Sequence, residues 1–361
     1  MFWAFFLYLL AAFAIQVPLR ERSLIGFHKE ITQIDSEVGN EYDVVHYLAD
    51  YLSAHGLTVE LQLVEEGREN VYAYLGRQRD NKVLLTSHID TNPAGKIPYH
   101  LEGEEIHVRG ACDAKGSVAS QVFAFLELWE EKIISEGDLA LLFVVGEEYN
   151  GISSFTAVSY LNASWSNAVI VGEPTENKLS VGHKGNFRFD VNAVGVSCHS
   201  GYPEQGFSAV EYLMNRIERL LQQEFPYSTL LGPTTVNIGK FSGGVAANLL
   251  APSAKAEIYI RVAENIELVN QTVSRIFSTA HSNYSIVQML EPQYLDHDVP
   301  GFELVACSYA TDIPYFKGKT AKRYLYGPGS ILVAHSAAEY ILPGDLYEAV
   351  RGYKSIVKYN I

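Results

Sequence analysis

Cysteine is scarce in this chain, and its scarcity excludes two kinds of small scaffold. Only three cysteines occur in 361 residues, Cys112, Cys198 and Cys307. They are too few and too scattered for a disulfide framework. No Cys-x-x-Cys pair occurs, so a structural zinc finger is excluded. One disulfide bond among them remains an alternative, although Cys112 and Cys198 each neighbour a candidate functional residue.

Basic residues are also in the minority. Lys and Arg number 27 against 42 Asp and Glu, which gives a formal net charge of −15. Binding to phosphates requires a basic face, so nucleic acid is not an expected partner. Hydrophobic residues make up 48% of the sequence, as in a globular protein. A chain of 361 residues exceeds the size at which one core keeps growing, so two domains are expected.

The chain has one continuously apolar terminal run, over residues 1–15. It is shorter than the roughly 20 residues that a membrane-spanning helix needs, so no stable span is expected. The small-x-small pattern of Ala12-Phe13-Ala14 favours a cleaved signal peptide over residues 1–14, although a basic n-region is lacking. A membrane anchor and a misassigned start are the alternatives. A signal peptide predicts a secreted, extracellular or vacuolar protein.

Three Asn-x-Ser/Thr sequons agree with secretion and predict a glycoprotein. The candidate glycosylation sites are Asn162, Asn270 and Asn283.

Short apolar runs alternate with amphipathic helical patterns along the first half of the chain. Runs bounded by glycine are typical of fully buried strands in a parallel sheet. The strands are expected at 70–75, 82–87, 139–145 and 168–172, with helices at 41–54 and 117–131. The pattern predicts an α/β fold with a mainly parallel sheet and helices on both faces.

The pattern changes at residue 182. Half-buried strands and two helices follow in the order β-α-β-β-α-β, a split-βαβ (ferredoxin-like) α+β arrangement. We therefore expect an inserted lid or dimerisation domain at 182–291. Residues 20–181 and 292–361 would form a discontinuous first domain.

Carboxylates and histidines follow several of the expected buried strands. They are His88, Asp90, Asp113, Glu147, Glu148, Glu173 and, far downstream, His335. Ligands of open α/β sheets bind beyond the carboxyl ends of the strands. Buried carboxylates are costly unless a cation compensates them, so their joint placement predicts a metal site. Five nitrogen and oxygen donors suit two ions, with one carboxylate shared between them.

Glu147 and Glu148 form an adjacent acidic pair. Neighbouring side chains in an extended segment point in opposite directions, so the two cannot bind one ion in the same way. If one binds metal, the other can face the attacking water as a general base.

Six motifs of the sequence resemble those of a known family. The motifs HIDTNP, GACDAKGS, GEEYNG, GEPTEN, GHKG and GPGSILVAHSAAE are similar, in order, to those of the dizinc amidohydrolases and exopeptidases. That family includes acetylornithine deacetylase, succinyl-diaminopimelate desuccinylase, aminoacylase and glutamate carboxypeptidase. The resemblance covers nearly all of the chain after the terminal apolar run.

The resemblance implies two Zn²⁺ per subunit, with Co²⁺ or Mn²⁺ as possible substitutes. It implies Asp113 as the bridging ligand, Glu147 as base and proton shuttle, and Asp90 as the residue that orients His88. A cis peptide after Asp113 is implied as well. The remaining ligands would divide into one pair, His88 and Glu173, and a second pair, Glu148 and His335.

Three residues of the inserted domain match the family motifs less strongly. His199 resembles the histidine that stabilises the oxyanion, often across a dimer interface. Asn248 and Arg261 resemble substrate-binding residues, with Arg261 pairing with a free carboxylate. The aspartate usual before the Ile-Arg pair is Tyr259 here. Asp312 resembles a Thr/Ser-Asp motif of the family, for which no catalytic role is predicted.

The resemblance implies a zinc enzyme that cleaves an amide or peptide bond next to a free carboxylate, and the predicted signal peptide favours a secreted carboxypeptidase. An N-acyl-amino-acid deacylase resembling acetylornithine deacetylase is the alternative, and an inactive binding protein on the same fold is a third. The expected substrate is a peptide or an N-acyl amino acid, and a homodimer through the inserted domain is possible.

Overall fold

The computed structural model describes residues 23–148 and 152–361. The chain divides into two compact units. Unit 1 comprises Met1–Val181, Leu295–Val305 and Thr311–Ile361, and unit 2 comprises Gly182–Tyr294 and Ala306–Ala310. Unit 2 thus runs past the predicted limit of 291 and takes in a short later segment. The predicted signal peptide lies outside the described residues, and none of the helices within them is long and apolar enough to cross a membrane.

The elements of unit 1 come from both ends of the chain. Its helices are α1 (Leu24–Gln33), α2 (Tyr42–Ala54), α3 (Lys115–Glu130), α4 (Ile152–Tyr160), the 3-10 helix η3 (Ile313–Phe316) and α7 (Pro343–Asn360). Its strands are β1 (Thr58–Glu65), β2 (Arg68–Tyr74), β3 (Asn81–His88), β4 (His100–Glu102), β5 (Glu105–His107), β6 (Leu139–Val144), β7 (Trp165–Val171), β17 (Lys322–Leu325) and β18 (Tyr340–Ile341).

The principal sheet of unit 1 has the strand order β1-β2-β6-β3-β7-β17. Strands β6, β3, β7 and β17 run parallel, whereas β2 is antiparallel to both β1 and β6. The sheet is therefore mainly parallel, with an antiparallel pair at one edge. Because β3, β6 and β7 point the same way, their carboxyl ends meet at one edge of the sheet.

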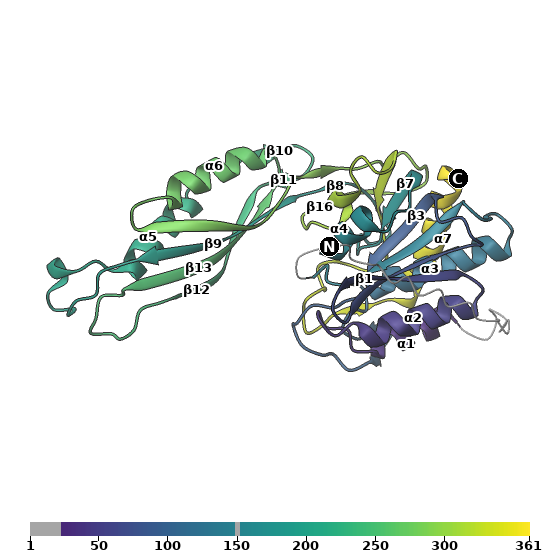
Figure 1. The fold of residues 1–361 in the computed structure, drawn as a ribbon, viewed down its shortest axis with the longest axis horizontal. Coiled ribbons are helices and arrows are strands. Elements are labelled where there is room, and N and C mark those ends of the chain that lie inside the picture. Colours follow the sequence, from purple (N-terminus) through teal and green to yellow (C-terminus); the bar gives the residue numbers. More distant parts are fainter. Residues whose placement is uncertain (1–22, 149–151) are drawn as a thin grey trace, which may run out of the picture. The chain divides into compact units, whose positions relative to one another are not determined.

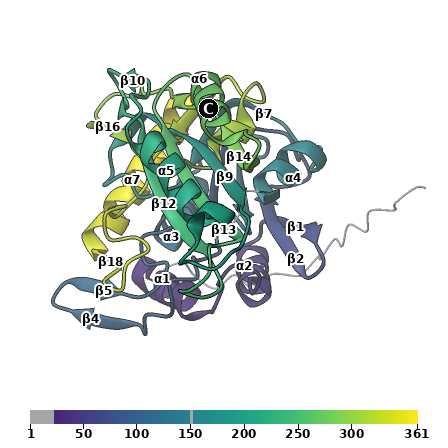
Figure 2. The ribbon, with the colours of Figure 1, turned by 90° about the vertical axis from the view of Figure 1, so that its left-hand side faces the viewer.

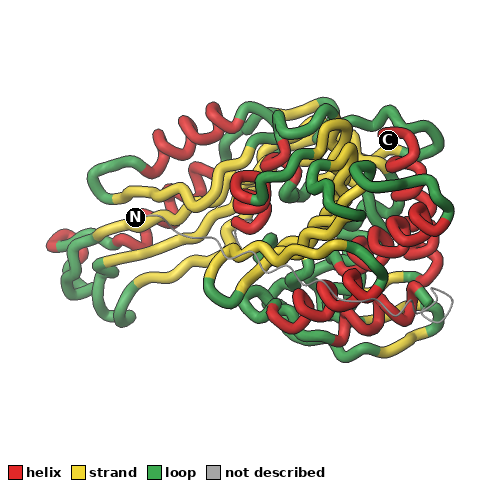
Figure 3. Tube along the Cα trace, turned by 45° about the vertical axis from the view of Figure 1, so that its right-hand side comes forward, coloured by secondary structure: helices red, strands yellow, loops and turns green. Residues whose placement is uncertain are grey.

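Both faces of this sheet are covered (Figures 1 and 3). Val83 and Leu85 of β3 belong to the core shared with α1, α2, α3 and α7, while Leu84 between them is buried on the other side. On that other side Trp165 packs edge-on against Phe316 of η3, with ring centroids 5.8 Å apart. Burial on both faces explains why the strands are continuously apolar. The predicted α/β class is confirmed.

Local patterns indicated most of the central elements but missed several others. The expected helices at 41–54 and 117–131 are α2 and α3, and Gly56, with φ +88°, follows the first as its terminating glycine. The edge strand β1, the short strand β17 and helices α1 and α7 were not predicted. Their burial depends on contacts with distant segments, which local periodicity does not reveal.

Helix α1 carries a buried histidine that should make stability depend on pH. His28 is fully buried, and its Nε2 atom donates to the carbonyl of Ala111 at 2.9 Å. Burial lowers the pKa of His28 from 6.5 to about 4. The unfolded chain therefore takes up this proton first, and stability present above pH 6.5 is lost as pH falls toward 4.

We expect the free energy of unfolding attributable to His28 to fall by about 2 kcal/mol between pH 7 and pH 5. A His28→Gln variant cannot titrate and should lack this part of the decline. Urea unfolding at both pH values measures it, with His46→Ala, a histidine on α2 that is not fully buried, as the control. Equal pH slopes for wild type and His28→Gln would contradict the assignment.

Unit 2 is an α+β sandwich. Its helices are the 3-10 helix η2 (Pro203–Gln205), α5 (Ala209–Leu221) and α6 (Ile266–Phe277). Its main strands are β9 (Gly185–Val194), β12 (Thr235–Gly243), β13 (Ser253–Val262) and β14 (Ser282–Leu290), and short strands β10 (Tyr227–Ser228) and β11 (Gly232–Pro233) pair with each other. Strands β8 (Leu179–His183), β15 (Gln293–Tyr294) and β16 (Leu304–Cys307) form a small separate sheet.

The main sheet of unit 2 is antiparallel, with the order β12-β13-β9-β14. Helices α5 and α6 cover one of its faces (Figure 2), where Phe187 and Phe189 of β9 are buried. Helix α5 begins at the cap Ser208, whose side chain accepts from the amide of Glu211. The opposite face carries the polar residues that alternate with these phenylalanines.

Candidate metal centre and active site

The ends of three parallel strands supply the first side chains of the site. His88 is the last residue of β3, Glu147 and Glu148 follow β6, and Glu173 follows β7 after a single glycine. That glycine, Gly172, is needed because a Cβ atom there would lie 2.5 Å from Gln121 Nε2 and 2.7 Å from Ser117 Cβ. The close approach of α3 thus holds the end of β7 against its neighbours.

The carboxylate of Asp113 lies between two groups of candidate ligands. Its Oδ1 atom is 3.0 Å from Nε2 of His88, and its Oδ2 atom is 3.2 Å from Nε2 of His335. Glu173 approaches the first group, with Oε1 3.7 Å from His88 Nε2. Glu148 approaches the second, with Oε1 3.0 Å from His335 Nε2. The structure therefore brings all five predicted ligands together, and each imidazole faces Asp113 and one glutamate.

His335 reaches this cluster from an unusual backbone conformation. Its φ angle is +61°, in the left-handed region that few side-chain-bearing residues adopt. Its side chain is 54% exposed, whereas that of His88 is 1% exposed. One half of the cluster is thus enclosed, and the half that contains His335 is open to an incoming ligand. The predicted cis peptide, between Asp113 and Ala114, is present.

The charges of the cluster favour a cation. Burial alone would lower the pKa of His88, but Glu173 and Asp113 raise it well above its ordinary value. Hydrogen bonds with Asp113 and Glu148 raise the pKa of His335 to about 10. Burial raises the pKa of Glu173 well above its ordinary value; His88 opposes this shift and Asp113 adds to it. The carboxylates raise the pKa of both imidazoles because they stabilise positive charge between them. A divalent metal ion can take the place of these protons, so the donor set fits such ions.

Asp90 connects the end of β3 to the segment that follows β6. Its carboxylate accepts hydrogen bonds from the amides of Glu147 (3.2 Å) and Glu148 (3.1 Å). The ring of His88 is bonded through Nδ1 to the Asp90 carbonyl oxygen at 2.9 Å, while the carboxylate Oδ1 is 3.7 Å from the same atom. Asp90 therefore orients His88 chiefly through its backbone, and its side chain positions the acidic pair.

Glu147 lies in an acidic environment beside the cluster. Burial raises its pKa well above the ordinary value, and the neighbouring carboxylate of Asp312 adds to the rise. Asp312 itself is buried and accepts a hydrogen bond of 2.6 Å from Ser154. Burial raises the pKa of Asp312 to about 7, although that hydrogen bond opposes the shift. A carboxyl group with a raised pKa can take up a proton and release it near neutral pH.

Sequence reasoning missed the residues that support Asp113 from behind. Glu339 is fully buried, and its Oε1 atom accepts from the amides of Cys112 and Asp113, both at 3.3 Å. Its other oxygen pairs with Arg109 at 2.7 Å. The available signal was a glutamate four residues after His335, in the same motif, but only the fold shows what it contacts.

Two of the predicted residues of unit 2 lie side by side. The amide of Ser200 donates to the carbonyl of Asn248 at 2.9 Å, and His199 forms an isolated bridge with Leu249. The side chain of His199 is exposed, with Nδ1 accepting from the amide of Gly201 at 3.0 Å. Both His199 and Asn248 are therefore on solvent-accessible loops of unit 2.

Arg261 lies elsewhere in unit 2, near the end of β13. It is eight residues beyond Ser253, where that strand begins, or about 27 Å along an extended chain. The structure therefore does not place Arg261 with His199 and Asn248 within one chain.

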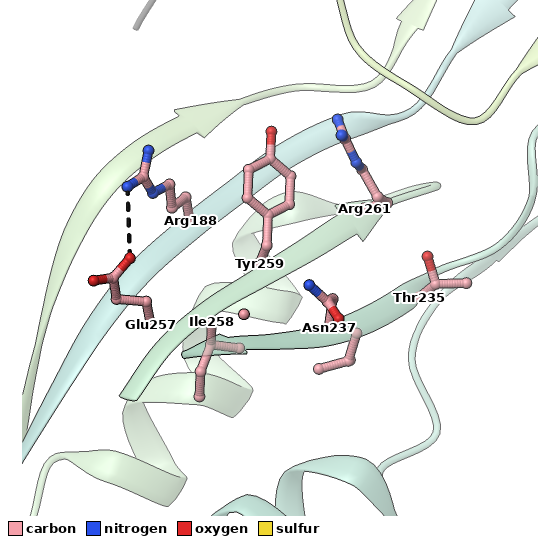
Figure 4. Close-up of a pocket in the computed structure, with 9 residues that line it drawn as sticks. Arg188, Thr235, Asn237, Glu257, Ile258, Tyr259 and Arg261 are labelled. Atoms are coloured by element: carbon pink, nitrogen blue, oxygen red, sulfur yellow. Dashed lines mark ion pairs between the residues drawn. The ribbon is translucent and has the colours of Figure 1, made fainter. Parts of the chain in front are cut away.

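Arg261 lines a pocket of about 320 Å³ on the sheet face opposite the helices. Arg188, Tyr259 and Arg261 project from this face (Figure 4). The guanidinium of Arg261 donates to the amide oxygen of Asn186 at 2.8 Å and lies 4.4 Å from the ring centroid of Tyr259. Both partners are uncharged, so they orient the guanidinium without neutralising it. Tyr259, which stands where the family usually has aspartate, thus helps to orient Arg261.

The sequons and cysteines are also placed by the structure. Asn162 and Asn283 are exposed, whereas Asn270 is half-buried and its Oδ1 atom accepts from the hydroxyl of Tyr284 at 2.9 Å. All three cysteines are free.

A mainly parallel α/β sheet with a carboxylate-imidazole cluster at its carboxyl edge fits a metal-dependent hydrolase of the peptidase and amidohydrolase class. The profile of peptidase family M20/M25/M40 matches residues 84–359. The chain belongs to this family, which confirms the resemblance found in its motifs.

Two fungal relatives span nearly the whole chain. The chain is 54% identical, over 94% of its length and 85% of the relative's, to a peptidase M20 domain-containing protein of Schizosaccharomyces pombe. It is 39% identical, over 97% of its length and 91% of the relative's, to a probable carboxypeptidase of Aspergillus clavatus.

Solved structures share the fold at much lower identity. A tripeptidase from Staphylococcus aureus matches with a TM-score of 0.78 and 21% identity, covering 93% of this chain and 97% of that one. An M20 family metallo-carboxypeptidase from Sulfolobus solfataricus matches with a TM-score of 0.75 and 16% identity, covering 93% and 99%. A dinuclear metal-binding M20 peptidase from Bacillus subtilis matches with a TM-score of 0.66 and 15% identity, covering 93% and 96%.

Proposed function

We propose that this chain is a secreted, zinc-dependent carboxypeptidase that hydrolyses the peptide bond next to a free C-terminal carboxylate. The observation that carries the proposal is the position of Asp113. Its two oxygens face two separate imidazole-glutamate pairs, with Glu147 beside them. The fungal relative named as a probable carboxypeptidase supports the choice of substrate.

The five clustered side chains would hold two zinc ions. His88 and Glu173 would serve one ion, His335 and Glu148 the other, and Asp113 both. Zinc takes nitrogen and oxygen donors and, in catalytic sites, keeps a position open for water or substrate. When bound, the ions supply Lewis acidity that polarises the scissile carbonyl and makes a water molecule more acidic.

Glu147 is the proposed proton carrier. It accepts a proton from the attacking water and returns it to the nitrogen of the leaving amine. The backbone amide of Glu147 donates to Asp90, which fixes this residue beside the cluster. Its neighbour Glu148 contacts His335 and acts as a ligand instead. The two acids lie in a turn after β6, and the contact of Glu148 with His335 separates its role from that of Glu147.

Recognition of the free carboxylate is assigned to Arg261. A guanidinium binds a carboxylate through two parallel hydrogen bonds, and the uncharged partners of Arg261 leave its positive charge available. Arg188 in the same pocket faces Glu257, with Nη2 3.9 Å from Oε2, so its charge is partly compensated (Figure 4). This difference favours Arg261 as the substrate ligand.

His199 and Asn248 are proposed to act in a homodimer formed through unit 2. The separation between these residues and Arg261 along β13 supports this proposal. A second copy of the chain would then supply the oxyanion-stabilising histidine, as the family resemblance implies.

Secretion, followed by N-glycosylation, is proposed from the terminal apolar run and the sequons. Exposure of Asn162 and Asn283 suits attachment of a glycan, whereas Asn270 is less accessible. The compartment would be extracellular or vacuolar.

A matched substrate panel tests the proposed reaction. We expect turnover of N-blocked dipeptides with a free C-terminus and none of the same dipeptides with an amidated C-terminus. N-acetyl amino acids form the third arm of the panel. Turnover of N-acetyl amino acids alone would replace the carboxypeptidase with the N-acyl-amino-acid deacylase.

Substitution of Arg261 extends the same assay. Arg261→Ala should lower kcat/KM for the free-carboxylate substrate by about 10- to 150-fold, since a hydrogen bond to a charged group contributes about 1.5–3 kcal/mol. Arg261→Lys keeps the charge but loses the two-pronged geometry, so its activity should be intermediate. Arg188→Ala is the matched control, and an effect as large as that of Arg261→Ala would contradict the assignment.

A further inference from the structure

A second cluster of imidazoles and carboxylates lies outside the site described above. It occupies the hairpin formed by β4 and β5, residues 100–107, which pairs with β18 (Figure 2). In register, His100 lies opposite His107 and Glu102 lies opposite Glu105, with a two-residue turn between the strands. Residues two apart on a strand share a face, so all four side chains project from the same side of the hairpin.

The spacing of these donors resembles that of the strand-end cluster. Nε2 of His107 is 2.9 Å from Oε2 of Glu105 and 4.0 Å from Oε2 of Glu102. One potential ligand atom from each of His100, Glu102 and His107 lies within 4.8 Å of the others. In a tetrahedral zinc site neighbouring ligand atoms are about 3.4 Å apart, since each lies about 2.1 Å from the ion. Glu102 is exposed, so rotation of its side chain can bring its carboxylate closer to the two imidazoles.

The two imidazoles are fixed in position, and Nε2 of His107 would exchange its hydrogen bond with Glu105 for a bond to the ion. Their rings are stacked, with centroids 4.9 Å apart and an angle of 11° between their planes. Nδ1 of His100 donates to the carbonyl of Pro98 at 2.9 Å, which leaves the lone pair of Nε2 free. Metal-binding histidines commonly make this second hydrogen bond to a backbone carbonyl. His107 is buried, and its ring also contacts that of Tyr340 on β18, with centroids 5.4 Å apart.

We propose that this hairpin is a third metal site, which binds one zinc or similar transition-metal ion through His100, His107 and the carboxylate of Glu102 or Glu105. Imidazole and carboxylate donors together suit zinc, copper and nickel better than calcium or magnesium. The site is separate from the strand-end ligands.

The position of the hairpin gives the ion a structural role. His107 lies six residues before Asp113, and Tyr340 lies five residues after His335. The pairing of Tyr340 with His107 joins these two segments, and the adjacent Arg109–Glu339 ion pair joins them again. An ion that fixes the hairpin therefore stabilises the strands that precede and follow two ligands of the strand-end cluster.

Zinc titration of the holoenzyme tests the proposal. The protein should carry no polyhistidine tag and should first be dialysed to its stable metal content, measured by elemental analysis. Calorimetric titration with Zn²⁺ should then show one further equivalent per chain. His100→Ala and His107→Gln should each weaken this binding by at least about tenfold, while the metal retained on dialysis stays unchanged. His46→Ala on α2 is the matched control and should bind like wild type.

Thermal unfolding supplies a second measurement, because a ligand bound only by the folded state raises the melting temperature. Added Zn²⁺ should raise Tm for wild type and His46→Ala but not for His100→Ala. The proposal is overturned if no further equivalent binds, or if the same equivalent and Tm shift persist in His100→Ala and His107→Gln. Loss of the strand-end metals would instead lower the metal content measured after dialysis. The experiment therefore distinguishes a failure of the hairpin site from a failure of the strand-end site.

Discussion

Replacing Glu147 with glutamine should lower kcat by about 10²–10⁴-fold, the usual contribution of a positioned acid-base group. Glutamine has the same size but cannot accept the proton of the attacking water. The amide of residue 147 would still donate to Asp90, so the loop should keep its position. Metal content should stay at the wild-type level, because the closest imidazole contacts are made by Asp113, Glu148 and Glu173. Steady-state kinetics and elemental analysis on the same preparation measure both quantities.

Glu130→Gln provides the matched control for this change. Glu130 is the exposed last residue of α3 and is not part of the cluster. It should retain wild-type kcat and metal content. If Glu147→Gln retained wild-type kcat, or lost its metal together with its activity, Glu147 would not be the proton carrier.

Replacing Asp113 with asparagine should remove metal from both halves of the site. The amide nitrogen has no lone pair to offer an ion, and the negative charge shared by the two groups is lost. We expect metal affinity to fall by more than about 100-fold and activity to fall with it. His335→Ala should affect one half only, because His335 contacts Asp113 and Glu148 but His88 contacts Asp113 and Glu173.

The comparison of these two variants tests whether Asp113 is shared. Elemental analysis after dialysis should give about two ions per chain for wild type, about one for His335→Ala and fewer for Asp113→Asn. Circular dichroism of each variant confirms that it is folded. The proposed arrangement would be contradicted if Asp113→Asn retained one ion while His335→Ala retained none.

The strand-end ligands could be predicted because their signal is local. A histidine or glutamate separated from an apolar run by only one or two residues is expected at the end of a buried strand, where a carboxylate is costly without a cation. His88, Glu148 and Glu173 each met this condition. His335 follows the short apolar run of residues 331–334 and was counted among the five donors, but in the structure that run forms turns and not a strand. The left-handed backbone at His335 brings its ring to Asp113.

The supporting contacts could not be predicted in the same way. The hydrogen bonds from the backbone amides of residues 147 and 148 to Asp90 join segments nearly sixty residues apart. The hydrogen bond between Glu339 and the amide of Asp113 spans 226 positions. Periodicity over a short window carries no information about such pairs. The hairpin cluster also became visible only when strand register placed His100 opposite His107.

Residue patterns alone were enough to predict the α/β class, an inserted unit beginning at residue 182 and the chemical identity of the donors. Apolar runs and charged strand ends decide these features, because burial selects residue types position by position. Tertiary structure alone decided which oxygen of Asp113 faces which imidazole, that the partners of Arg261 are uncharged, and that four hairpin side chains share one face. Those features depend on distances between remote segments, and only the packed chain sets them.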